Sequence, residues 1–293
     1  TLRISFSEYN TEDDINAFKE ALTEGIRISA AHIDSPRIDL KQVPLYEDSG
    51  MAFLKTHYYG GIRKYQWVAT PLALHGVVIK ADGESVWVSI GEDPTDPVLY
   101  INDLLPHLGK EQAKRPLSEG IKGEELNILI GSRPFKADAG SNLVKLNILK
   151  LLNEKYGINE CDFQTAELTI VPAAKAKDVG FDRSLVGSYG HDDRICSYPA
   201  LTSLLSLEKP AKTSVAVLVD KEEIGSAGIT GMRSAFFTDF LLALCDGYNA
   251  RVAFKNSAAI SADVSAAFDP TYASAYEPKN SCYINNGVII AKY

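Results

Sequence analysis

The sequence predicts an α/β domain that is interrupted by a β-rich insert. Two observations lead to this prediction. Helical and strand-like patterns alternate towards both ends of the chain, whereas the middle shows strands and turns. In addition, every candidate metal ligand lies outside that middle segment. We therefore expect residues 1–42 and 177–293 to form one domain and residues 43–176 to form the insert.

The first flank begins with a strand-like run at Leu2–Phe6. A helix is expected next, because Thr11 suits a helix N-cap and apolar residues recur at helical spacing until Gly25. Alternating apolar residues over Ile26–His32 then predict a strand.

The middle segment carries strand patterns at Leu72–Ile79 and Ser85–Ile90, on either side of a turn. An amphipathic helix is expected over Leu143–Tyr156, where Gly157 stops it. A further strand is expected at Thr165–Val171.

The second flank returns to alternation. A helical pattern runs from Asp192 to Leu207, an apolar strand follows at Ser214–Val219, and another helix is expected over Ser234–Cys245. The continuous apolar run at Ser214–Val219 is typical of a buried strand in a parallel sheet.

Composition excludes several classes. The net charge of −8 argues against a nucleic-acid partner, and no apolar run approaches the length of a membrane span. The four cysteines are scattered without a CxxC pair, so we expect free thiols in a reducing compartment and a cytoplasmic protein.

The most informative motif is the carboxylate pair Glu222–Glu223, directly after the apolar strand. The carboxyl ends of strands in open α/β sheets are where ligands bind. Neighbouring carboxylates there repel each other unless a cation compensates them, which a divalent metal does well. One carboxylate can then bind metal while its neighbour takes a proton. A solvated charge pair is the alternative.

A histidine stands at the end of the first-flank strand, in the sequence His32-Ile33-Asp34. Positions two apart share one face of a strand, so Asp34 can orient the imidazole of His32 while one ring nitrogen faces a metal. The alternatives are a hydrogen-bonded core histidine and a turn aspartate before Ser35-Pro36.

Two further sites add carboxylates, the Asp192–Asp193 pair at a helix start and Asp263 after an apolar run. With His32 and the Glu222–Glu223 pair, they form a ligand set suited to hard or borderline divalent ions, zinc first. Helix capping is the alternative for the aspartate pair.

The chain resembles the aspartyl aminopeptidase family of metallo-aminopeptidases. The resemblance rests on six stretches spread over most of the sequence: AHIDSP (31–36), YYGGIRKYQW (58–67), PLALHG (71–76), VPAAKAKDVGFDRSLVGSYGHDDR (171–194), DKEEIGS (220–226) and SADVSAA (261–267). It implies a zinc-peptidase-like catalytic domain with a mixed sheet flanked by helices. It also implies removal of N-terminal residues from peptides by metal-activated water.

The resemblance assigns roles to the candidate residues. Glu222 is expected to be the general base, and Asp34 to support His32. The expected metal ligands are His32, Asp192, Glu223 and Asp263, with Asp192 bridging two ions. Zinc is the first candidate metal, with cobalt and manganese as alternatives. Asp193 is expected to be structural, in a pair with Arg194.

The resemblance further implies that the insert serves subunit association in a homo-oligomer, with a tetrahedral dodecamer as the family's form. A histidine of the insert would then reach a neighbouring subunit's site to contact substrate. His107 stands near the matching place, and a surface histidine is an equal alternative.

The family also has a histidine ligand near its C-terminus, beyond Tyr293, and the chain is therefore expected to be truncated. The alternatives to an active aminopeptidase are an incomplete fragment that acts only in assembly, or a related glutamyl-aminopeptidase-type peptidase or deacylase.

Overall fold

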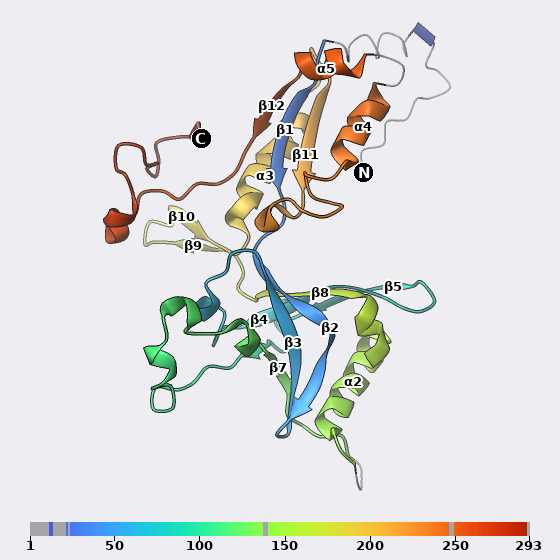
Figure 1. The fold of residues 1–293 in the computed structure, drawn as a ribbon, viewed down its shortest axis with the longest axis vertical. Helices are drawn as coiled ribbons and strands as arrows, with labels where there is room; N and C mark the ends of the chain where they lie inside the picture. The colour runs from blue at the N-terminus through green and yellow to red at the C-terminus, as the bar shows by residue number, and fades with distance from the viewer. Residues whose placement is uncertain (1–11, 14–21, 23, 137–139, 246–248, 292–293) are drawn as a thin grey trace. The chain divides into compact units, whose positions relative to one another are not determined.

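The computed structural model describes residues 12–13, 22, 24–136, 140–245 and 249–291. Its contacts divide the chain into two compact units (Figure 1). The split unit combines Thr1–Asp34 with Gly190–Tyr293, and the insert unit comprises Ser35–Tyr189.

The domain boundaries that we predicted, 42/43 and 176/177, fall at different places from this division by contacts. At the first boundary, β2 (Arg37–Asp48) begins before residue 42 and pairs with strands of the insert unit. At the second boundary, the hairpin of β9 (Lys177–Val179) and β10 (Leu185–Gly187) is grouped with the insert unit.

The predicted strand at Leu2–Phe6 and most of the helix between Thr11 and Gly25 lie outside the described residues. Leu22, from the end of that region, is fully buried. Gly25 has a φ of +94°, and a Cβ there would lie 2.1 Å from the carbonyl oxygen of Asn256. Glycine is therefore required where the chain enters the first strand of the split unit.

A three-stranded parallel sheet forms the centre of the split unit, in the order β11-β1-β12. Its strands are β1 (Arg27–His32), β11 (Ser214–Val219) and β12 (Ala258–Ser261). The predicted strand at Ser214–Val219 is confirmed with both bounds. In the register, His32 lies opposite Val219, so the carboxyl ends of β1 and β11 coincide.

Among the described residues, this sheet is accompanied by three helices, α3 (His191–Leu205), α4 (Phe236–Leu244) and α5 (Ala250–Asn256). Helix α3 contacts β1 and β11. On α4 and α5, Leu241 and Ala253 join Leu22 and Ile26 in an apolar cluster. The predicted α/β class is confirmed, because helices cover a parallel sheet.

The insert unit is built on a seven-stranded antiparallel sheet with the order β5-β4-β8-β2-β3-β7-β6 (Figure 1). Besides β2, its strands are β3 (Met51–Tyr59), β4 (Leu72–Ile79), β5 (Ser85–Ile90), β6 (Tyr100–Ile101), β7 (Ile128–Gly131) and β8 (Ala166–Pro172). The predicted strands at 72–79 and 85–90 are confirmed with both bounds. The sequence analysis did not identify β2 and β3, which form the longest pairing in this sheet.

Helix α2 (Leu143–Tyr156) matches its predicted range. It ends because Gly157 adopts a left-handed conformation with φ of 67°. Ile148, Leu149 and Leu152 of α2 pack against the main apolar cluster of the unit, which includes buried Ile38, Leu72 and Ile170 from the sheet. None of the helices in the described part of the chain has the length and apolar character that a membrane crossing requires.

Gly76 in β4 provides a test of the packing inside the insert sheet. Its φ is +144°, and a Cβ would lie 1.9 Å from the backbone oxygen of Glu167 in β8. We expect Gly76→Ala to lower the free energy of unfolding by more than about 3 kcal/mol, because it adds both backbone strain and a clash with backbone.

Gly83 is the matched control, since its φ is +87° but no atom lies within 4 Å of its Cβ position. Gly83→Ala should cost only the strain of the left-handed conformation, about 1–2 kcal/mol. Urea unfolding of both variants measures the difference, and equal losses would contradict the proposed clash.

Candidate metal centre

The candidate site residues of the split unit come from strand ends and one helix start. His32 is the last residue of β1, and Asp34 lies two residues beyond it. Glu222 and Glu223 follow β11, and Asp263 follows β12. Because the three strands are parallel, these side chains approach each other at one edge of the sheet.

Helix α3 completes the cluster from its first turn. Asp192 and Asp193 have non-helical backbone angles, and the peptide bond between them is cis. The hydroxyl of Ser197, one turn later, donates a hydrogen bond to the backbone oxygen of His32. That buried bond fixes the helix start against the end of β1.

His32 is the centre of the cluster, and its ring is buried. Its Nδ1 lies 2.9 Å from the Asp34 carbonyl oxygen, which can only accept, so Nδ1 carries the hydrogen in this bond. In the neutral ring, Nε2 is then left with its lone pair. It lies 2.9 Å from Asp192 Oδ1, 3.8 Å from Asp263 Oδ1 and 3.9 Å from Glu222 Oε2.

Asp34 connects the two strand ends. Its buried carboxylate accepts hydrogen bonds from the backbone N–H groups of Glu222 (3.1 Å) and Glu223 (3.2 Å). Its Oδ1 also lies 3.3 Å from His32 Nδ1. Asp34 therefore orients the imidazole and positions the Glu222–Glu223 turn at the same time.

The clustered charges and burial shift several pKa values. Burial, followed by the charge of Asp192, raises the pKa of Glu223 to about 7. Burial also raises the pKa of Asp193. Burial lowers the pKa of His32, but the carbonyl and carboxylate of Asp34 and the Glu222 carboxylate outweigh it, so the pKa lies above its ordinary value.

In the described part of the chain, two groups of side chains have ligand atoms close enough to hold an ion. His32, Asp192 and Glu223 form one group, and His32, Asp193 and Asp263 form the other, with all atoms of a group within 4.8 Å of one another. One imidazole nitrogen with carboxylate oxygens suits zinc and similar divalent ions.

A buried oxygen without a partner supports this fit. Asp193 is fully buried, and its Oδ1 accepts a hydrogen bond from the backbone N–H of Cys196. Its Oδ2 has no hydrogen-bond partner among the described residues. A buried, unpartnered carboxylate oxygen is costly, and a cation beside it removes that cost.

Asp193 is a candidate ligand that we expected to be structural, because an aspartate pair at a helix start also fits capping. The expected pair of Asp193 with Arg194 is not among the ion pairs of the described residues. The signal available in the sequence was the adjacency of two acids after His191, which alone does not say which one faces a metal.

His107 belongs to the insert unit. It is exposed and belongs to a turn after β6. Its expected contact with the substrate of another subunit therefore stays a prediction.

The chain is similar in sequence to known zinc aminopeptidases. A family model described as aminopeptidase I zinc metalloprotease (M18) matches residues 14–293. The probable M18 family aminopeptidase 1 of Clostridium acetobutylicum is 54% identical over 281 residues, which are 94% of this chain and 60% of that protein. The aspartyl aminopeptidase of Caenorhabditis elegans is 25% identical, over 91% of this chain and 61% of its own length.

Solved structures agree in fold. The M18 aminopeptidase of Thermotoga maritima aligns with a TM-score of 0.86 and 44% identity, over 90% of this chain and 59% of that one. A yeast mApe1 structure, described as a dodecamer, aligns with a TM-score of 0.69 and 20% identity, over 90% of this chain and 60% of that one. The chain thus spans about three fifths of the relatives that it matches.

The raised pKa of Glu223 predicts how metal affinity depends on pH. A carboxylate must lose its proton to bind metal, and a pKa of about 7 leaves Glu223 mostly protonated at pH 6. We expect zinc affinity to fall about tenfold from pH 8 to pH 6 through this residue, with His32 adding to the fall. Competition with a chromophoric chelator measures it.

Glu223→Gln serves as the control for this pH dependence, because it keeps the shape of the side chain but has no proton to lose. The variant should bind zinc more weakly at pH 8 and show a shallower pH dependence. A wild-type affinity that stays constant between pH 8 and pH 6 would contradict the prediction.

Proposed function

Because the chain belongs to the aminopeptidase I zinc metalloprotease (M18) family, we propose that it carries most of the active site of a metal-dependent aminopeptidase. The substrate class is peptides with a free amino terminus. The observation that carries the proposal is the cluster around His32 Nε2, where Asp192, Glu222 and Asp263 each place an oxygen within 3.9 Å.

The proposed metal ligands are His32, Asp192, Glu223 and Asp263, with Asp192 shared between two ions. Zinc suits this set best, and cobalt and manganese are the alternatives. The side chain of Asp192 is about half exposed, and its Oδ1 lies 2.9 Å from His32 Nε2. A divalent ion would supply Lewis acidity, which polarises a scissile carbonyl and acidifies water.

Glu222 is the proposed general base. Its side chain is about half exposed, so water and a peptide can reach it, and its backbone is held by Asp34. The carboxylate would take a proton from the attacking water and later pass it to the leaving amine. Asp34 acts as a positioning residue, through its bonds to both His32 and the Glu222–Glu223 turn.

We also propose that the whole protein is a cytoplasmic homo-oligomer. A yeast mApe1 structure with a similar fold is described as a dodecamer, and the insert unit provides a separate body that could serve association. In this arrangement His107 of one subunit would contact substrate bound at another. The free state of all four cysteines supports a reducing compartment.

An assembly fragment without turnover is the second candidate, favoured by the three-fifths coverage of the relatives. Metal content and hydrolysis of amino-terminal peptide bonds should be measured for this chain and for a polypeptide extended by the relatives' C-terminal part. Turnover in the extended chain alone would assign catalysis to the whole protein. Absence of metal and turnover in both would overturn the proposed function.

Substitution of the base separates catalysis from metal binding. In an active, full-length protein, Glu222→Gln should leave bound metal nearly unchanged and lower kcat by roughly two to four orders of magnitude. Glu208→Gln, at an exposed position after α3, is the control and should keep full activity. A Glu222→Gln enzyme with nearly normal kcat would exclude Glu222 as the base.

The two aspartates of α3 can be distinguished by metal analysis. Asp192→Asn should reduce the bound metal per chain together with activity, because it removes the proposed shared ligand. Asp193→Asn should retain more metal than Asp192→Asn. The reverse order, measured by elemental analysis after dialysis, would transfer the shared role to the buried Asp193.

A further inference from the structure

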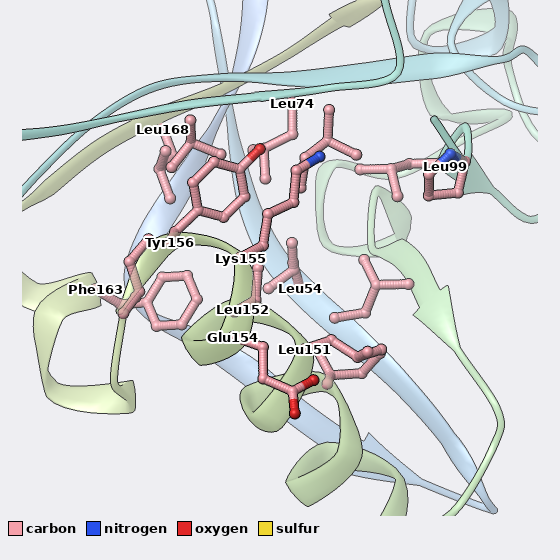
Figure 2. Close-up of a pocket in the computed structure, with 16 residues that line it drawn as sticks. Leu54, Leu74, Leu99, Leu151, Leu152, Glu154, Lys155, Tyr156, Phe163 and Leu168 are labelled. Carbon is pink, nitrogen blue, oxygen red and sulfur yellow. The ribbon is translucent and has the colours of Figure 1, made fainter. Parts of the chain in front are cut away.

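A cavity of about 540 Å³ lies within the insert unit, between α2 and the sheet (Figure 2). Leu54, Leu74 and Leu168 contribute to its wall from β3, β4 and β8, while Leu152 and Tyr156 contribute from α2. Its size falls in the range of about 300–1,000 Å³ that ligand pockets occupy in proteins.

The wall of this cavity is almost entirely hydrocarbon. Further aliphatic and aromatic side chains line it, among them Val88, Ile90, Leu99, Ile148 and Phe163. Water inside such a space would find few hydrogen-bond partners, and an apolar molecule would restore the contacts that the wall lacks. The cavity therefore favours an apolar occupant over solvent.

The charged residues at the cavity already have partners. Lys155 Nζ lies 3.2 Å from Asp96 Oδ1, and Glu154 Oε1 lies 2.7 Å from Lys150 Nζ. The Tyr156 hydroxyl donates a hydrogen bond to the backbone oxygen of Ser89. Because each charge is compensated within the unit, the cavity offers no net charge to a charged ligand.

We propose that this cavity is a binding site for an uncharged apolar small molecule with an aromatic or short aliphatic skeleton. The site belongs to the insert unit and uses none of the metal-centre residues, so it is independent of the proposed peptidase activity. A ligand bound between α2 and the sheet would stabilise the folded insert unit.

The test uses two fluorescent probes that share one skeleton. N-phenyl-1-naphthylamine is uncharged, and 8-anilinonaphthalene-1-sulfonate adds a sulfonate. We expect saturable binding of the uncharged probe at one site per chain, with an increase in Tm of the insert unit. The sulfonate should bind at least about tenfold more weakly, because its charge must be desolvated without a partner.

Two substitutions on α2 locate the binding. Leu152→Trp fills the cavity and should weaken the uncharged probe at least about tenfold. Leu146→Trp changes the same residue type on the same helix, but Leu146 is 45% exposed and does not line the cavity, so binding should be retained. Leu99→Phe, on the opposite wall, provides a second filling variant if Leu152→Trp does not fold by circular dichroism.

Three results would overturn the proposal. The first is absence of saturable binding of the uncharged probe to the wild-type chain. The second is equal affinity in Leu146→Trp and in folded filling variants. The third is release of the probe as the chain concentration rises, since a second copy would then occupy the cavity instead of a small molecule.

Discussion

The buried carboxylate of Asp34 holds together the parts on which the candidate centre depends. Its backbone oxygen accepts the Nδ1 hydrogen of His32, and its side chain accepts two backbone N–H groups after β11. One residue thus sets the tautomer of the imidazole and the position of Glu222 and Glu223. Loss of this carboxylate would leave the backbone N–H groups of Glu222 and Glu223 unpaired, whereas the bond from His32 Nδ1 to the Asp34 backbone oxygen would remain.

In the same region, several carboxylates lie close together and repel each other when ionised. Parallel strands bring Glu223, Asp192 and Asp263 to one sheet edge, while burial raises the pKa values of Glu223 and Asp193. The ionised forms of Glu223 and Asp193 therefore destabilise the fold. A divalent cation reverses both effects. The fold and the ion are therefore linked, and ion binding should be strongest where the carboxylates are deprotonated.

The sequence predicted best where local signals and tertiary structure agree. The strands at Ser214–Val219 and Leu72–Ile79 and the helix at Leu143–Tyr156 have strong periodicity and clear end signals. In contrast, β2 contains polar residues over Lys41–Gln42 and an irregular register between Leu40 and Leu45, so alternation is interrupted. Its pairing with β3 and β8 depends on contacts that no local pattern encodes.

At the site, the residue types and strand ends were sufficient to select His32, Asp34, Glu222 and Glu223 as candidates, because strand ends can be located from sequence. Which oxygen of the Asp192–Asp193 pair faces the histidine could not be predicted, since it depends on the non-helical backbone at that helix start. In the insert unit, the ion pair between Lys155 and Asp96 was also not predictable from sequence, because it joins residues far apart in the chain.

The division of the split unit has a consequence for protein synthesis. Its central strand, β1, ends at His32 and is therefore synthesised long before its partner β11, which begins at Ser214. At about 5–20 residues per second, roughly ten seconds or more of translation separates the two strands. The insert unit can fold during that interval, while β1 waits with both edges unpaired and its apolar face uncovered. The nascent chain is thus most in need of chaperone protection after its middle portion is already native.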